Sequence, residues 1–192
     1  MRRRFLLLFA FLAVSSPAFS LTVLQLNLEQ LTALSQKVFV GRCASVVQER
    51  DSAGRPVQVI TYDVEEMIKG EPTARVTFRQ LGLTGDSSDH QEMGDLTVVG
   101  VFRELPRYEV GEESVVFLSE EGRLGLTAPV GLMQGKFDVK VTDGKKTVVN
   151  GAGNRGLFIG WKKRLKEKNL VKQNGGELPL DNFVSLVKKL YE

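Results

Sequence analysis

Two stretches, VFVGRCASVV (38–47) and VQVITYDVEEMI (57–68), carry the alternation of side chains that is typical of β-strands. Successive side chains of a strand point to opposite faces of a sheet. Val38 should therefore face one side, and Phe39 and Cys43 the other. The polar segment DSAGRP, which contains glycine and proline, separates the two stretches. This arrangement predicts an antiparallel hairpin.

More strands are expected further along the chain. ARVTFRQL (74–81), LTVVGVF (96–102) and SVVFLSE (114–120) are rich in β-branched and aromatic residues, which favour strands. GKFDVKV and KTVVNG then flank Asp143-Gly144, a pair that favours a tight turn with positive φ. The sequence therefore predicts a mainly β fold with a second hairpin.

Glycine is frequent in the region that is expected to form the sheet. All 19 glycines of the chain lie after residue 20. Glycines between β-branched runs suit a closed, strongly turned antiparallel sheet. We therefore expect a barrel-like sheet between Val38 and Gly151, with Phe39, Phe78 and Phe117 buried in its core.

A short helix is expected before the sheet, in LNLEQLTALSQ (26–36). Asn27 followed three residues later by Gln30 has the spacing of a capping box. Three leucines are expected on one face of this helix, Leu28, Leu31 and Leu34.

A second, amphipathic helix is expected at the end of the chain, in LPLDNFVSLVKKLYE (178–192). Asp181 is the expected N-cap. Lys188 and Lys189 lie near its C-terminus, where the helix dipole favours cations. The apolar face is expected to consist of Phe183, Leu186, Val187 and Leu190.

Residues 1–20 have the three parts of a secretory signal peptide. Three arginines precede an apolar run of ten residues, and small residues permit cleavage after Ala18 or Ser20. A helix that spans a bilayer needs roughly 20 apolar residues, so we expect a cleaved signal and give an uncleaved membrane anchor second place. Residues 21–192 then form one β-barrel domain with a C-terminal helical extension from about residue 152.

The charge balance argues against a nucleic-acid partner. The chain has 26 lysines and arginines and 23 acidic residues, a net charge of +3. Without Arg2, Arg3 and Arg4 the basic count falls to 23, so the remaining chain is formally neutral. A protein that follows phosphates usually presents a net basic face. Cys43 is the sole cysteine, so no intrachain disulfide can form.

No residue pattern indicates catalysis. The acidic loop 86–95 is interpreted as solvated, with a weak cation site as the alternative, because its spacing fits no EF-hand. His90, the one histidine, lacks the partners of a zinc site or a serine triad. Cys43 lies in an expected strand and is interpreted as a buried small residue. We therefore expect no enzyme activity, and name no catalytic, cofactor-binding or metal-binding residue.

The basic stretch 161–172 has two interpretations. Trp161 and two leucines lie among its lysines and arginine, an arrangement that could rest on an anionic membrane surface. Its apolar face is thin, however, and a solvated basic face is the simpler interpretation.

Several short motifs together resemble a known group of proteins. Their order, VFVG, then TYDVEEMIKG, then GEESVVFL, is similar to that of exported bacterial proteins of unknown function that look like netrin and tissue-inhibitor-of-metalloproteinase barrels. The matching residues are Val40, Gly41, Thr61, Val64, Glu66, Lys69, Gly70, Gly111, Glu112, Phe117 and Leu118. The resemblance implies an OB-like barrel. The inhibitors' zinc-binding cysteine has no counterpart near Leu21.

These features together predict an exported, non-enzymatic binding domain. Its expected partner is a protein or glycan of the cell envelope, and it acts in the periplasm or as a secreted protein. Two alternatives stay open: a periplasmic enzyme built on carboxylates that the sequence does not pair, and a membrane-surface module that uses residues 161–172.

Overall fold

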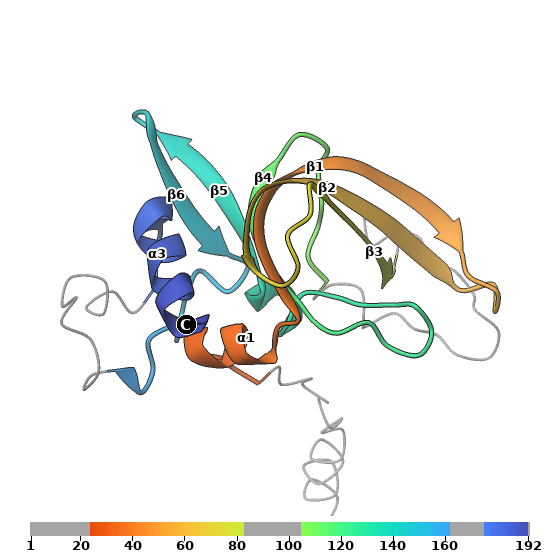
Figure 1. Cartoon of the computed structure of the whole chain (residues 1–192), viewed down its shortest axis with the longest axis horizontal. Helices are drawn as coiled ribbons and strands as arrows, with labels where there is room; N and C mark the ends of the chain where they lie inside the picture. The colour runs from red at the N-terminus through yellow and green to blue at the C-terminus, as the bar shows by residue number, and fades with distance from the viewer. Residues whose placement is uncertain (1–23, 83–104, 162–174, 192) are drawn as a thin grey trace, which may run out of the picture.

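The computed structural model describes residues 24–82, 105–161 and 175–191, and its described part is mainly antiparallel β-sheet (Figure 1). The expected signal peptide, the strand at 96–102 and the acidic loop 86–95 lie outside these residues. The elements are α1 (Leu28–Leu34), β1 (Lys37–Arg50), β2 (Pro56–Lys69), β3 (Arg75–Leu81), β4 (Glu113–Leu118), the 3₁₀-helix η2 (Leu132–Gln134), β5 (Lys136–Thr142), β6 (Lys145–Asn150), β7 (Leu178–Pro179) and α3 (Leu180–Tyr191).

The seven strands form one sheet in the order β3-β2-β1-β4-β5-β6-β7, and all neighbours are antiparallel. The antiparallel sheet and both expected hairpins are therefore confirmed. Within the described ranges, β3 and β7 stay at opposite ends of this order and do not pair with each other. One hydrogen bond does reach the outer edge of β3, where the N–H of Thr127 donates to the carbonyl of Arg79 at 2.8 Å.

The long β1–β2 hairpin is bent by irregular pairing. Val40 pairs with Glu66 while the next residue, Gly41, pairs with Val64. Glu65 is therefore the extra residue of a β-bulge. Gly41 is needed at this point because a Cβ there would lie 2.7 Å from the carbonyl oxygen of Asp63.

Local interactions explain the turns of the β1–β2 and β5–β6 hairpins. In the first turn, the Arg55 guanidinium bonds the Asp51 carboxylate at 2.6 Å and lowers the pKa of that carboxyl. In the second turn, Asp143 and Gly144 have φ of 51° and 72°, as the sequence predicts. Gly144 adopts this left-handed conformation without the steric cost of a side chain.

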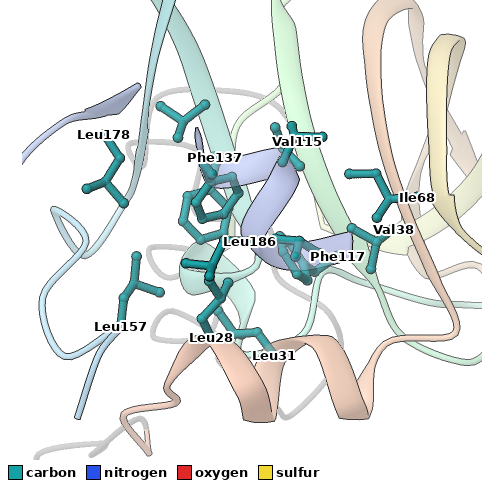
Figure 2. Packing of buried hydrophobic residues seen from close by; sticks show 14 of the residues in the cluster. Leu28, Leu31, Val38, Ile68, Val115, Phe117, Phe137, Leu157, Leu178 and Leu186 are labelled. Atoms are coloured by element: carbon teal, nitrogen blue, oxygen red, sulfur yellow. The ribbon is translucent and has the colours of Figure 1, made fainter. Parts of the chain in front are cut away.

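Both faces of the sheet are covered by apolar packing. Val38, Val40, Val115 and Phe117 face a cluster that includes both helices, and Phe39 faces a second cluster on the opposite side. Figure 2 shows Phe117, Phe137 and Leu186 packed together in the first cluster, with Leu28 and Leu31 of α1 beneath them. The expected burial of the three phenylalanines is confirmed, since Phe39, Phe78 and Phe117 are all core residues.

Helix α1 begins with the capping box that the sequence predicts. The Asn27 side chain accepts from the N–H of Gln30, and the Gln30 side chain accepts from the N–H of Asn27. Leu28 and Leu31 are buried, but the prediction for Leu34 is wrong, because that side chain is 60% exposed. An α-helix has about 3.6 residues per turn, so each three-residue step rotates the side chain away from the buried stripe.

Helix α3 packs against α1, β2 and β6. Phe183, Leu186 and Val187 are buried, and Leu190 is partly buried against the same cluster, as expected. The interpretation of Asp181 as the N-cap is wrong. The helix follows β7 directly and begins at Leu180, which places Asp181 in the first turn.

Candidate functional site

A groove of about 510 Å³ lies where α3 crosses the sheet. Its lining comes from β1, β2, β4, β6 and α3, and combines apolar with charged side chains. The lining residues are Val40, Glu65, Glu66, Glu113, Lys146, Leu180, Asp181, Val184, Ser185 and Lys188. We call this feature the α3 groove.

Helical spacing and a β-bulge bring these residues together. Leu180, Val184 and Lys188 are four residues apart, a spacing that places side chains on one face of a helix. On the other wall, adjacent residues of a regular strand would face opposite sides of the sheet. The bulge at Glu65 removes this alternation, so that both Glu65 and Glu66 line the groove.

Glu113 provides a buried negative charge at the groove. Its side chain is only 7% exposed. Both of its carboxylate oxygens accept hydrogen bonds from the Lys146 ammonium, at 2.8 and 2.7 Å. A guanidinium nitrogen of Arg42 lies 3.3 Å from one of these oxygens. The buried carboxylate is therefore held by two cations, which a buried charge requires.

Two further ion pairs lie at the exposed rim. Arg42 lies 3.6 Å from a carboxylate oxygen of Glu65, and Lys188 of α3 forms an ion pair with Glu66 of β2. The Lys188 pair joins the helix to the sheet across the groove. Among the described residues, no ion pair or hydrogen bond involves the carboxylate of Asp181.

The floor of the groove is apolar. Val40, Leu180 and Val184 are all buried, and all belong to the cluster that α3 covers. The groove thus combines an apolar floor with a rim of alternating charges. Seven of the ten lining residues are polar or charged, so the groove is more polar than the mostly apolar pockets that hold small molecules.

A second polar cluster lies on the other side of the sheet, around Lys136. Lys136 is 4% exposed and pairs with Glu112 at 2.7 Å and Asp138 at 2.5 Å. Its ammonium also lies 5.4 Å from the centre of the Tyr108 ring. The Tyr108 hydroxyl donates to the side chain of Gln80 at 3.0 Å, and burial raises the pKa of Tyr108. Lys136 is thus the buried charge of this cluster, and its partner Asp138 is half exposed.

Cys43 is buried, as its place in the strand pattern predicts. The side chain is 1% exposed, and burial raises the pKa of the thiol to about 11. The reactive form of cysteine is the thiolate, so this environment suppresses nucleophilic character. Within the described ranges, no group of three His, Cys, Asp or Glu side chains has the arrangement of a metal site.

Of the basic stretch 161–172, the structure describes only Trp161. Trp161 is buried and packs against Phe158, with 5.7 Å between the ring centres. It therefore belongs to the core and presents no aromatic surface to a membrane. The remainder of that stretch, like the acidic loop and His90, lies outside the described residues. None of the described helices is both long and apolar enough to span a membrane.

Sequence reasoning predicted no residue of the α3 groove as a site residue. Val40 and Glu66 were named only in the resemblance motifs, and Asp181 and Lys188 only as parts of the expected C-terminal helix. The paired glutamates at 65–66 interrupt the strand alternation, and this irregularity is the one local signal that could have marked the wall of the groove. A comparison with known protein families, curated proteins and solved structures gave no match.

Proposed function

We propose that this chain is an exported, non-enzymatic binding domain that holds a protein or glycan of the cell envelope in the α3 groove. The observation that carries the proposal is the groove itself: an apolar floor of Val40, Leu180 and Val184 beneath a rim whose three glutamates are already paired with cations. Preformed pairs hold the rim in place before a ligand arrives, which lowers the cost of ordering on binding.

The state of Glu113 supports binding over catalysis. A general base must lie within hydrogen-bond reach of the proton that it removes, and the Glu113 side chain is only 7% exposed. Both oxygens of Glu113 are bound by Lys146, and Arg42 contacts one of them. The alternative of a periplasmic enzyme would rest on the other carboxylates of the groove, of which Glu65 and Glu66 are also paired.

The strand order supports an OB-like architecture. An OB-type fold is a five-stranded, partly open Greek-key barrel. The order β3-β2-β1-β4-β5 is that of such a barrel opened between its third and fifth strands. In this proposal the domain is a scaffold, and α3 with the adjoining strands provides the recognition surface.

Export is proposed from the charged, apolar and small-residue parts of the first 20 residues. The protein isolated from the cell envelope should begin at Phe19 or Leu21, which intact-mass measurement would reveal. An intact Met1 on a protein found in the cytoplasm would contradict export.

Site-specific photo-crosslinking in the producing cell tests the proposed binding. A photoreactive residue replaces Ser185, an exposed side chain that lines the groove, and in a matched strain it replaces Glu120, an exposed residue outside that lining. We expect illumination to join an envelope protein or glycan to the Ser185 variant and not to the Glu120 variant. Equal labelling at both positions, or none at Ser185, would contradict the proposal.

A further inference from the structure

We propose that the protein docks on the surface of a lipid bilayer through an apolar patch around α1, separate from the α3 groove. The patch consists of large apolar side chains that are more than half exposed: Leu24 (75%), Leu34 (60%), Ile159 (58%) and Tyr191 (52%). We call it the α1 patch. Of the proposed function, this inference rests on export alone and not on the ligand of the α3 groove.

Two members of the patch meet at the N-terminal end of α1. The Asn27 side chain donates to the carbonyl of Ile159 at 3.1 Å. The N–H of Leu28 donates to the carbonyl of Leu157 at 2.9 Å. The segment that contains Leu24 therefore runs beside the segment that contains Ile159.

The other two members meet at the C-terminal end of α1. The Lys69 ammonium donates to the carbonyl of Thr32 at 2.8 Å and lies 5.8 Å from the centre of the Tyr191 ring. Leu34 is the last residue of the helix. With seven residues and a rise of 1.5 Å per residue, α1 spans only about 10 Å. Figure 1 shows α1 at the lower edge of the molecule with α3 beside it.

The gathering of these side chains distinguishes the patch from ordinary surface. Of the eight large apolar side chains that are exposed in the described ranges, half surround this one short helix. Apolar residues that are exposed singly are normal, whereas a group of them marks contact with a protein or a membrane.

The composition of the patch favours a membrane. Besides Tyr191, it has the long basic side chains of Lys69 and Arg155 at its border. Arg155 is exposed and precedes Gly156, next to which the Gln25 side chain lies. Tyrosine rings and long basic side chains suit the boundary between hydrocarbon and headgroups, because each has an apolar body and a polar end.

The chain leads from this patch toward the membrane. The apolar run 5–14 of the expected signal ends ten residues before Leu24. Ten residues span at most about 35 Å. A signal held in the bilayer during export therefore keeps the α1 patch near the lipid surface. After cleavage behind Ser20, the new N-terminus carries Leu21 and Val23, which extend the apolar sequence beyond Leu24.

Sedimentation with lipid vesicles tests the proposal on the protein purified as the cell produces it. The vesicles consist of phosphatidylethanolamine and phosphatidylglycerol. Leu24→Ser/Leu34→Ser removes one apolar side chain from each end of the patch. The matched control is Val110→Ser/Val141→Ser, at positions that are 67% and 66% exposed. Val141 lies on β5, and Figure 1 shows the β5–β6 turn at the end of the view opposite to α1.

We expect the wild type to sediment with the vesicles. Leu24→Ser/Leu34→Ser should lower the vesicle partition coefficient about tenfold, because membrane affinity scales with the apolar area that enters the lipid. The control should change it by less than about twofold, since its side chains stay in water. No sedimentation of the wild type, or equal losses in the two variants, would overturn the proposal.

A fluorophore on α1 gives a second measurement that does not depend on weakened binding. Cys43 is the sole cysteine and is buried, so a cysteine introduced by Leu34→Cys can be labelled selectively with a nitrobenzoxadiazole dye. Vesicles should shift its emission to shorter wavelength and leave the dye at Val141→Cys unchanged. No shift at Leu34→Cys, or equal shifts at both positions, would contradict docking through α1.

Other results separate this proposal from its rivals and from the proposed function. Dimers in solution that Leu24→Ser/Leu34→Ser separates, without vesicle binding, would assign the patch to a second copy of the chain and overturn lipid docking. Crosslinking at Ser185 without vesicle binding would overturn lipid docking and retain the groove. Vesicle binding without that crosslinking would support lipid docking and contradict the function proposed for the groove.

Discussion

Lys146 and Glu113 form a two-point ion pair although their strands are not neighbours in the sheet. Lys146 belongs to β6 and Glu113 to β4, with β5 between them in the strand order. The ammonium nitrogen nevertheless lies 2.8 and 2.7 Å from the two carboxylate oxygens. The two side chains therefore share one face of the sheet, and Lys146 reaches across β5 to Glu113.

Substitution of Lys146→Met should reduce the free energy of unfolding by about 1–3 kcal/mol, because the buried carboxylate of Glu113 loses its main partner. Arg42 remains as a partner and limits the loss. Urea denaturation measures the effect. Lys145→Met is the matched control, since the neighbouring Lys145 is exposed, and it should change stability by less than about 0.5 kcal/mol. Equal effects of the two substitutions would show that the ion pair contributes nothing specific.

Phe117→Ala should reduce the free energy of unfolding by about 3–5 kcal/mol, the usual range for a buried phenylalanine. Phe117 is fully buried, and its ring centre lies 5.4 Å from that of Phe137 and 6.2 Å from that of Phe183. Leu124→Ala, at an exposed position, is the control. A loss below about 1 kcal/mol for Phe117→Ala would contradict the packing of this cluster.

Stability should fall as the pH rises above about 9, and Cys43 should account for part of the fall. Burial raises the pKa of its thiol from 9.0 to about 11 in the folded protein. Between these values the unfolded chain has lost the proton and the folded chain retains it. The unfolded state therefore binds fewer protons, and stability decreases with pH.

The matched variant for this pH dependence is Cys43→Ala. It should be less stable at neutral pH, since it leaves a small cavity, but it should lose stability less steeply between pH 9 and about 10.5. Tyr62 and Tyr108, whose pKa values burial also raises, contribute the remaining slope in both proteins. Urea denaturation across this pH range provides the comparison, and parallel curves for the two proteins would refute the role of Cys43.

Deletion of residues 180–192 should lower the melting temperature, because it removes the buried side chains of Phe183, Leu186 and Val187 and uncovers the sheet. Leu186→Ala is the milder variant and should cost about 2–5 kcal/mol. Ser185→Ala, at the adjacent exposed position, is its control. An unchanged melting temperature after the deletion would mean that α3 is a tail and not part of the core.

Local patterns in the sequence were sufficient for most secondary structure. The alternation in residues 38–47 and 57–68 predicted the first hairpin and the two-sided burial of β1. The Asp143-Gly144 pair predicted the second turn, and the Asn27–Gln30 spacing predicted the capping box. Each of these features depends on residues that are close in the chain, so a short window contains its cause.

The errors also have a local origin. Leu34 was assigned to the buried face because residues three apart lie close together over one helical turn. Over two turns, repeated three-residue steps rotate the side chain out of the buried stripe, and Leu34 is exposed. Asp181 was assigned as the N-cap, one residue after the true start of the helix at Leu180. The strand β7 before it has only two residues, which is too short to give a recognisable pattern. In both cases the surrounding packing, and not the nearest neighbours in sequence, sets the outcome.

The α3 groove could not be deduced from the sequence, because its walls come from segments far apart in the chain. Arg42 and Glu113 are 71 residues apart, and Glu113 and Lys146 are 33 apart. Periodicity assigns a face to each side chain within its own strand or helix. Which faces meet depends on the strand order, on the bulge at Glu65 and on the docking of α3, and these arise from long-range packing of apolar surface that no local pattern encodes.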